Sequence, residues 1–145
     1  MNQIQSLSIT DIKTASGATF AKLNLFYQHF GQPLDKAPVV LINHSLTGDA
    51  DVAGPKGWWK ELVGSEKTID TNQYAVLAFN IPGNGVEGQL LSNPKDFHAG
   101  DIAALFLKGL ELLGVSKLHA LVGGSIGGGI AWEMAVIAPQ LTQYL

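Results

Sequence analysis

Three short apolar runs constrain the fold of this chain more than any other feature of the sequence. They occupy residues 39–42, 74–79 and 118–122. Uninterrupted apolar runs of about four to eight residues are typical of strands that are buried on both faces of a parallel sheet. Because 46% of the 145 residues are hydrophobic, the chain is also long and apolar enough to bury such a sheet in one domain.

Two segments with helical spacing follow the second and third runs. In residues 96–113 the apolar side chains recur at intervals of three and four, and Gly114 supplies the left-handed position at which such a helix ends. Residues 125–138 predict a second helix, which Pro139 ends. Strands that alternate with helices through short connections predict the α/β class, with a mostly parallel sheet and flanking helices.

The first thirty residues predict strands of a different kind. Segments 7–12 and 20–30 are strand-like, and the second alternates apolar with polar residues, as a half-buried antiparallel strand does. No repeat, low-complexity tract or linker divides the sequence. We therefore expect one domain in which antiparallel strands precede the parallel ones.

The sequence Gly-Gly-Ser-Ile-Gly at residues 123–127 matches G-x-S-x-G, in which a serine sits on a sharp turn between a strand and a helix. The match follows an apolar run and opens a predicted helix, as the pattern requires. The strained serine leaves no room for side chains two positions away, which explains Gly123 and Gly127. Ser125 is therefore the candidate nucleophile of an α/β-hydrolase fold, and the backbone N–H of Ile126 is a candidate oxyanion donor. A glycine-rich turn that only packs helix on strand is the alternative.

A second oxyanion donor is expected after the first apolar run, where this fold takes one from a loop. Residues 44–48, His-Ser-Leu-Thr-Gly, lie there, and Leu46 is the candidate donor. His44 is either a ligand or base, or a hydrogen-bonded structural residue, which is the commoner role for a histidine that ends a buried strand. Asp49 and Asp51 are expected to cap the loop, since no further ligands nearby complete a metal site.

Residues 83–88, Gly-Asn-Gly-Val-Glu-Gly, spell the G-x-G-x-x-G pattern of dinucleotide-binding folds. That pattern should open a helix, but the chain reaches Pro94 before the next helical spacing begins. The acidic residue expected about 20 positions later has no counterpart, because Asp101 falls inside a predicted helix. We therefore expect a loop here, and no bound dinucleotide.

Composition and charge exclude several classes of partner. The net charge is −3 and the nine basic residues are scattered, so no surface for nucleic acid is expected. The absence of cysteine rules out disulfides and thiolate metal sites. Neither a signal-peptide pattern nor an apolar stretch of about 18 residues is found, so we expect a cytoplasmic protein without a membrane partner.

Several motifs taken together resemble the homoserine O-acetyltransferase family. They are His-Ser-Leu-Thr-Gly-Asp at 44–49, Gly-Trp-Trp at 57–59, Asp-Thr at 70–71, Asn80, and Gly-Gly-Ser-Ile-Gly-Gly at 123–128, in that family's order and spacing. The resemblance spans about residues 20–140. The chain departs from the family at Ile126, where methionine is usual, and at residues 85–89, where a Gly-Ser-Thr-Gly-Pro stretch is usual.

The resemblance implies a serine acyltransferase with the α/β-hydrolase fold. Such enzymes accept an acyl group from acyl-coenzyme A on a serine and pass it to the hydroxyl of homoserine or a similar amino acid. By this resemblance Ser125 carries the acyl group, Leu46 and Ile126 stabilise the oxyanions, and acetyl-coenzyme A is a co-substrate, with no bound cofactor. Trp58 and Trp59 are expected to serve packing. Small molecules are the implied partners, and a homodimer is left open.

The acid and base of a catalytic triad are not expected within these residues. In this fold both follow the serine, yet twenty residues follow Ser125, and the one acidic residue among them is Glu133, two helical turns along. All four histidines precede Ser125. We therefore expect residues 1–145 to be the N-terminal half of one α/β-hydrolase domain, with the lid, the acid and the histidine elsewhere. This half is expected to be inactive alone. The open edge of its last strand is expected to favour self-association. A serine esterase and a non-catalytic binding module are the alternatives.

Overall fold

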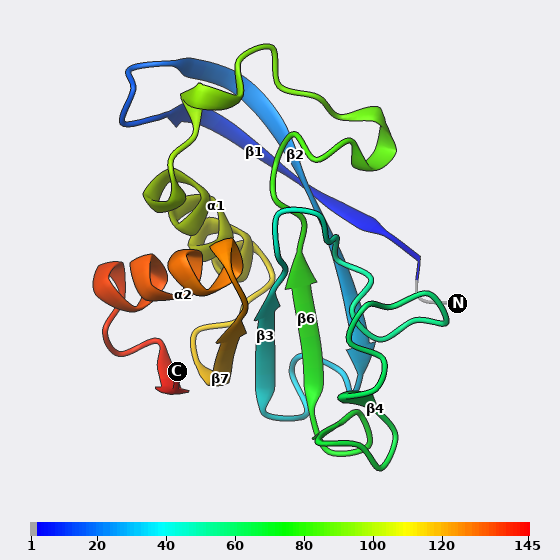
Figure 1. Ribbon diagram of the computed structural model, residues 1–145. Helices are drawn as coiled ribbons and strands as arrows, with labels where there is room; N and C mark the ends of the chain where they lie inside the picture. Colours follow the sequence, from blue (N-terminus) through cyan, green and yellow to red (C-terminus); the bar gives the residue numbers. More distant parts are fainter. Residues whose placement is uncertain (1–2) are drawn as a thin grey trace.

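The computed structural model describes residues 3–145, which form a six-stranded sheet and two long helices (Figure 1). The strands of the sheet are β1 (Gln5–Lys13), β2 (Thr19–Gly31), β3 (Val39–Asn43), β6 (Ala75–Phe79), β7 (Leu118–Gly123) and β8 (Thr142–Tyr144). The helices are α1 (Ala99–Leu112) and α2 (Ile126–Ile137). Shorter elements lie in the connections: strands β4 (Val63–Gly64) and β5 (Ile69–Asp70), and the 3-10 turns η1 (Val86–Gly88) and η2 (Pro94–Asp96).

The strand order in the sheet is β1-β2-β6-β3-β7-β8. β1 pairs antiparallel with β2, and β2 pairs antiparallel with β6. From β6 onward the pairing is parallel, with β3 between β6 and β7, and β8 beyond β7. The predicted α/β class, with a mostly parallel sheet and antiparallel strands from the first part of the chain, is confirmed.

Burial along the strands follows the apolar runs at the centre of the sheet and weakens toward its edge. Every residue of β3 and β6 is buried, as their sequences predict. In β2 the buried residues Leu23, Leu25 and Tyr27 alternate with more exposed ones. β7 is less buried than predicted, with Leu118 and Leu121 as its buried residues, because the edge strand beside it is only three residues long.

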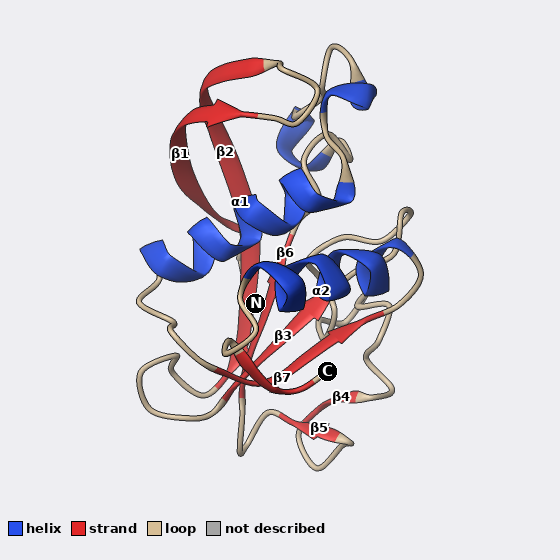
Figure 2. Ribbon diagram, turned by 90° about the vertical axis from the view of Figure 1, so that its left-hand side faces the viewer, coloured by secondary structure: helices blue, strands red, loops and turns tan. Residues whose placement is uncertain are grey.

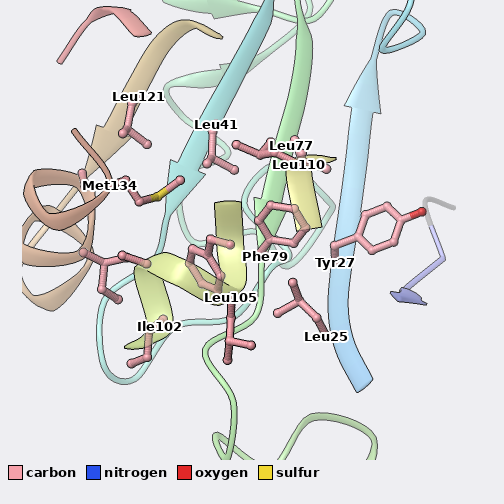
Figure 3. Packing of buried hydrophobic residues seen from close by; sticks show 14 of the residues in the cluster. Leu25, Tyr27, Leu41, Leu77, Phe79, Ile102, Leu105, Leu110, Leu121 and Met134 are labelled. Carbon is pink, nitrogen blue, oxygen red and sulfur yellow. The ribbon is translucent and has the colours of Figure 1, made fainter. Parts of the chain in front are cut away.

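Both long helices lie side by side on one face of the sheet (Figure 2). Between them and the sheet lies the main core, in which Leu41, Leu77 and Phe79 from the strands meet side chains such as Leu105 and Met134 from the helices (Figure 3). The opposite face is covered by the loop after β3, whose apolar residues Ala50, Val52 and Val63 pack on the sheet together with Trp58 and Trp59. The flanking helices are therefore confirmed for one face, while a loop covers the other.

The C-terminal end of α1 agrees with the sequence prediction, whereas its start differs. Gly114 has φ +72°, its N–H donates to Glu111 O at 3.0 Å, and the N–H of Val115 donates to Leu110 O at 2.9 Å, which is the predicted C-terminal motif. At its start, α1 begins at Ala99 rather than at residue 96, because η2 ends at Asp96 and the backbone of Phe97 and His98 is extended. No helix in residues 3–145 is long and apolar enough to cross a membrane.

Candidate active site

Ser125 lies on the turn that joins β7 to α2, at the carboxyl end of the parallel strands (Figure 1). Its backbone has φ 57° and ψ −127°, outside the regions that L residues ordinarily occupy. The residue is exposed, and its side chain makes no capping hydrogen bond to α2. The strand, turn and helix that the G-x-S-x-G pattern requires are therefore present, with the serine at the surface.

The two outer glycines of the motif fill positions that tolerate no side chain. A Cβ on Gly123 would overlap the carbonyl oxygen of Gly127. A Cβ on Gly127 would overlap the carbonyl oxygen of Asn43 and lie 2.6 Å from that of His44. The steric explanation given for the motif is confirmed, and it shows that the first turn of α2 packs directly on the end of β3.

The N–H of Ile126 is a free donor at the start of α2. Gly127 N–H donates to Gly124 O at 2.9 Å, and Gly128 N–H donates to Ser125 O at 3.0 Å. Within residues 3–145 the N–H of Ile126 has no such acceptor. A free N–H at a helix N-terminus carries partial positive charge, which suits a developing oxyanion beside Ser125.

The loop that carries Leu46 leaves the same edge of the sheet as the Ser125 turn. β3 and β7 are neighbours, and the last residues of the two strands, Asn43 and Gly123, are paired in the parallel register. Residues 45–48 form a turn closed by a hydrogen bond of 3.0 Å from Gly48 N–H to Ser45 O, and in the described part of the chain the N–H of Leu46 has no acceptor. The structure thus brings the two predicted donor segments together, while their catalytic roles stay predictions.

His44 has the structural role that was the commoner expectation. The side chain is fully buried at the end of β3. Its Nδ1 lies 2.6 Å from Ser45 O, and its Nε2 accepts a hydrogen bond of 3.0 Å from Ile81 N–H. Burial lowers the pKa of His44, partly opposed by the hydrogen bond to Ser45 and by the Asp49 carboxylate. Both ring nitrogens are occupied, so this histidine is not a base for Ser125.

Asp49 and Asp51 cap the loop, as predicted. The N–H of Asp51 donates to Asp49 Oδ1 at 2.8 Å, and the N–H of Gly54 donates to Asp51 Oδ1 at 2.8 Å. Residues 3–145 contain no group of three or more acidic or histidine side chains that could hold a metal ion.

Asn80 is a polar anchor whose role the motif reasoning missed. It is 3% exposed, and its Oδ1 accepts a hydrogen bond of 3.0 Å from Ala50 N–H. Its amide also pairs with that of Asn84, at 2.9 and 3.1 Å. The end of β6 therefore holds the loop after β3. The available signal was an asparagine directly after a fully apolar run, because a buried amide needs partners.

The two tryptophans form a half-buried pair on the sheet face opposite the helices, with their ring centroids 4.5 Å apart. Trp58 Nε1 donates to Asp49 O at 3.0 Å. Trp59 lies beside the serine turn, since a Cβ on Gly124 would be 3.8 Å from its Cζ2 atom. Their expected packing role is confirmed, and Trp59 also borders the candidate site.

Residues 83–88 form a loop, as predicted, and do not open a helix. Gly83, Gly85 and Gly88 all have positive φ, and the chain passes from η1 into extended backbone at Gln89. Asp101 lies in the first turn of α1, where it accepts hydrogen bonds from two backbone N–H groups. No helix N-terminus follows the glycines closely enough to receive a pyrophosphate in the manner of a dinucleotide-binding fold.

The other histidines and Glu133 are engaged away from Ser125. His29 Nε2 lies 2.6 Å from Gln32 O, and the ring of His119 stacks on that of Tyr74 with a distance of 5.1 Å between the ring centroids. His98 lies at the start of α1, with its side chain 63% exposed. The carboxylate of Glu133 lies beside Gly100 on α1. None of these contacts supplies Ser125 with an acid or a base.

The family that is described as the alpha/beta hydrolase fold matches residues 38–142. The chain therefore belongs to the α/β-hydrolase fold family. Within it, the chain is similar to homoserine O-acetyltransferases. It is 34% identical to the one from Methanobrevibacter ruminantium over 96% of this chain and 32% of that protein, and 34% identical to the one from Corynebacterium efficiens over 96% and 40%.

Solved structures support the same grouping. The homoserine O-acetyltransferase from Staphylococcus aureus superposes with a TM-score of 0.84 at 27% identity, covering 98% of this chain and 45% of that one. Esterase E22 superposes with a TM-score of 0.85 at 24% identity, covering 99% of this chain and 46% of that one. At this identity, the similarity shows the fold alone. The chain thus spans between about a third and a half of the length of these proteins, and its resemblance to homoserine O-acetyltransferases is confirmed.

Proposed function

We propose that residues 1–145 carry the nucleophile and both oxyanion donors of a serine acyltransferase. The proposed reaction transfers an acetyl or similar acyl group from acyl-coenzyme A to the hydroxyl of homoserine or a related amino acid. The observation that carries the proposal is the exposed, strained Ser125 beside the free N–H of Ile126, at the sheet edge from which the Leu46 loop also leaves. The similarity to homoserine O-acetyltransferases supports the acyl acceptor.

Two acyl transfers make up the proposed cycle. In the first, Ser125 Oγ attacks the thioester carbonyl, a C–O bond forms, the C–S bond breaks, and coenzyme A leaves as the thiol with the proton from the serine. In the second, the hydroxyl of the amino acid attacks the serine ester, its proton returns to Ser125, and the O-acyl amino acid leaves. Each addition places negative charge on the former carbonyl oxygen, which the N–H groups of Leu46 and Ile126 would receive.

The proposal assigns the acid and the histidine to chain outside residues 1–145. His29, His44 and His119 are engaged in other contacts, His98 lies at the start of α1, and the relatives are longer than this chain. Without a base, the serine hydroxyl stays protonated and is a weak nucleophile at neutral pH. We propose that residues 1–145 are the N-terminal part of one α/β-hydrolase domain that acts on small-molecule substrates in the cytoplasm, and that this part is inactive when expressed alone.

A steady-state assay of the native gene product tests the proposal. With acetyl-coenzyme A and homoserine, we expect release of thiol and formation of O-acetylhomoserine in equal amounts, with parallel lines in double-reciprocal plots, as a ping-pong mechanism gives. Ser125→Ala should lower kcat by about 10³-fold or more, whereas Ser6→Ala, an exposed serine on β1, should not. Turnover of simple esters without acyl transfer to any amino acid would instead identify a serine esterase.

A further inference from the structure

We infer that His44 is a positioning residue for the candidate site. Its side chain, a neutral imidazole protonated on Nδ1, fixes the Leu46 loop to the residues that follow β6. The inference rests on the proposed role of Leu46 as an oxyanion donor. The hydrogen bonds on which it is built do not depend on that role.

The partners of the imidazole determine where its proton lies. A backbone N–H can only donate, so the bond of 3.0 Å from Ile81 requires a lone pair on Nε2. A carbonyl oxygen can only accept, so the distance of 2.6 Å between Nδ1 and Ser45 O requires a proton on Nδ1. The fully buried side chain is therefore neutral and held in one tautomer.

Hydrogen bonds of His44 and Asn80 connect the loop after β3 to the residues that follow β6. Ser45 O, which accepts from His44, also accepts the Gly48 N–H that closes the turn around Leu46. Ile81 lies two residues after the end of β6, and Asn80 beside it holds the Ala50 N–H. The segment that carries Leu46 is thus held to the residues that follow β6 on both sides, by the imidazole of His44 before Leu46 and by Asn80 after it, and the amide of Asn84 adds a bond of 3.4 Å to Gly48 O.

His44 also touches the segment that carries the second proposed donor. The carbonyl oxygen of His44 lies against the first turn of α2, where a Cβ on Gly127 would be 2.6 Å from it. Ile126, the residue before Gly127, has the free N–H of that turn. One buried residue therefore contacts both segments that carry the proposed donors, the Leu46 turn through its ring and the first turn of α2 through its backbone carbonyl.

Protonation would break the arrangement. A second proton on the ring would lie on Nε2 and face the Ile81 N–H, so two donors would oppose each other. Asp49 on the same loop is the charged group that faces His44, and it favours the protonated form. Neither residues 80–82, which follow β6, nor residues 126–129, the first turn of α2, contain a titratable side chain. Burial outweighs both the hydrogen bond to Ser45 and the Asp49 carboxylate and lowers the pKa of His44. The hydrogen bonds of the neutral ring therefore persist at neutral pH and are lost when the ring is protonated in acid.

Nitrogen-15 NMR of the native gene product tests the tautomer and the titration. At pH 7 we expect His44 to carry its proton on Nδ1 with Nε2 unprotonated. On acidification, the amide signals of Leu46 and Ile81 should move together with one midpoint below the ordinary histidine value of about 6.5. A proton on Nε2 at pH 7, or amide signals of Leu46 that do not follow those of Ile81, would overturn the inference.

Two variants separate positioning from simple packing. The amide of His44→Gln reaches toward the Ile81 N–H, whereas that of His44→Asn reaches toward Ser45 O, so each retains one of the two bonds. We expect faster amide exchange in both variants at Gly48, whose N–H closes the turn on Ser45 O, with β7 and α2 unchanged. His98→Gln, a matched change at an exposed histidine, should have no effect. Unchanged exchange in the loop would contradict the inference. If neither variant folds, the wild-type titration decides.

In the native gene product His44→Gln should lower kcat about 10- to 100-fold with little change in KM, because only the transition-state contact of Leu46 is displaced. The NMR signals need no substrate. If Ser125 takes no acyl group while the loop titrates as described, the proposed function fails and the positioning role stands. If acyl transfer is observed but the loop does not follow His44, the positioning role fails alone.

Discussion

Ser125 holds its side chain at backbone angles that most L residues avoid, φ 57° and ψ −127°. A strained residue of this kind costs about 1–3 kcal/mol and persists because its surroundings force it. Here Gly123 packs on Gly127, and Gly127 packs on the end of β3, so the turn cannot relax. The strain keeps the hydroxyl above the helix N-terminus, where the proposed chemistry needs it.

Removing the side chain of Ser125 should therefore stabilise the fold. We expect Ser125→Gly to raise the free energy of unfolding by about 1 kcal/mol, because glycine adopts these angles without a Cβ clash. Ser125→Ala keeps the Cβ and should leave the stability within about 0.5 kcal/mol of the original. Urea unfolding followed by circular dichroism measures both. Equal stability of the two variants would show that the turn is not strained.

The close approach of α2 to β3 depends on Gly127. Gly127→Ala should destabilise the fold by about 3 kcal/mol, since its Cβ would meet backbone oxygens of two residues that cannot move aside easily. Gly129→Ala is the matched control on the same helix. It has no atom within 4 Å of its Cβ position and should stabilise α2 by up to about 1 kcal/mol. Similar effects of the two changes in thermal unfolding would contradict the packing described.

The sequence correctly located those strands and helix ends that a local pattern of residues determines. The apolar runs located β3, β6 and β7, and the C-terminal motif after α1 followed from one glycine. β8 was missed because its three residues have no strand pattern of their own and become a strand by pairing with β7. As a result, β8 rather than the third apolar run forms the open edge of the sheet.

The start of α1 was placed three residues too early for a related reason. The predicted segment overlapped η2 at Asp96, but the first α-helical turn is fixed by a single acidic side chain. Asp101 accepts the N–H of His98 at 2.9 Å and that of Ala15, from the β1–β2 connection, at 2.8 Å. The second of these contacts joins residues 86 positions apart, which no local pattern contains.

Asp101→Ala should therefore destabilise the fold by about 1–2 kcal/mol, through the loss of a helix-capping bond and of the bond to the β1–β2 connection. Glu111→Ala is the control on α1, because its exposed ion pair with Lys108 contributes about 0.5 kcal/mol or less. Amide exchange should also become faster at Ala15 in the first variant. A change no larger than that of Glu111→Ala would show that Asp101 does not fix the helix start.

For the whole molecule, the sequence located the candidate site but not its supports. Ser125, Ile126 and Leu46 follow from two motifs and their places after apolar runs. Asn80 with Ala50, His44 with Ile81, and the approach of Trp59 to Gly124 depend on segments that meet only in the folded chain. Such contacts are set by sheet order, which the spacing of motifs along the chain does not specify.

The exposed apolar side chains of α2 and the open edge of β8 predict self-association of the 145-residue chain. Trp132, Val136 and Ile137 are 67%, 71% and 51% exposed. Val136→Lys should lower the association measured by analytical ultracentrifugation, whereas Ala104→Lys, at an exposed position of α1, should not. A single monomeric species at all concentrations would contradict this prediction.

The transfer of an acyl group to Ser125 is the central step proposed for this molecule. Peptide mapping by mass spectrometry, after the native gene product is mixed briefly with acetyl-coenzyme A and quenched in acid, tests that step directly. We predict one acetyl adduct, on the peptide that contains Ser125, which is lost in Ser125→Ala and discharged when homoserine is added before the quench. An adduct that persists in Ser125→Ala, or its absence under conditions in which acyl transfer is observed, would contradict the account.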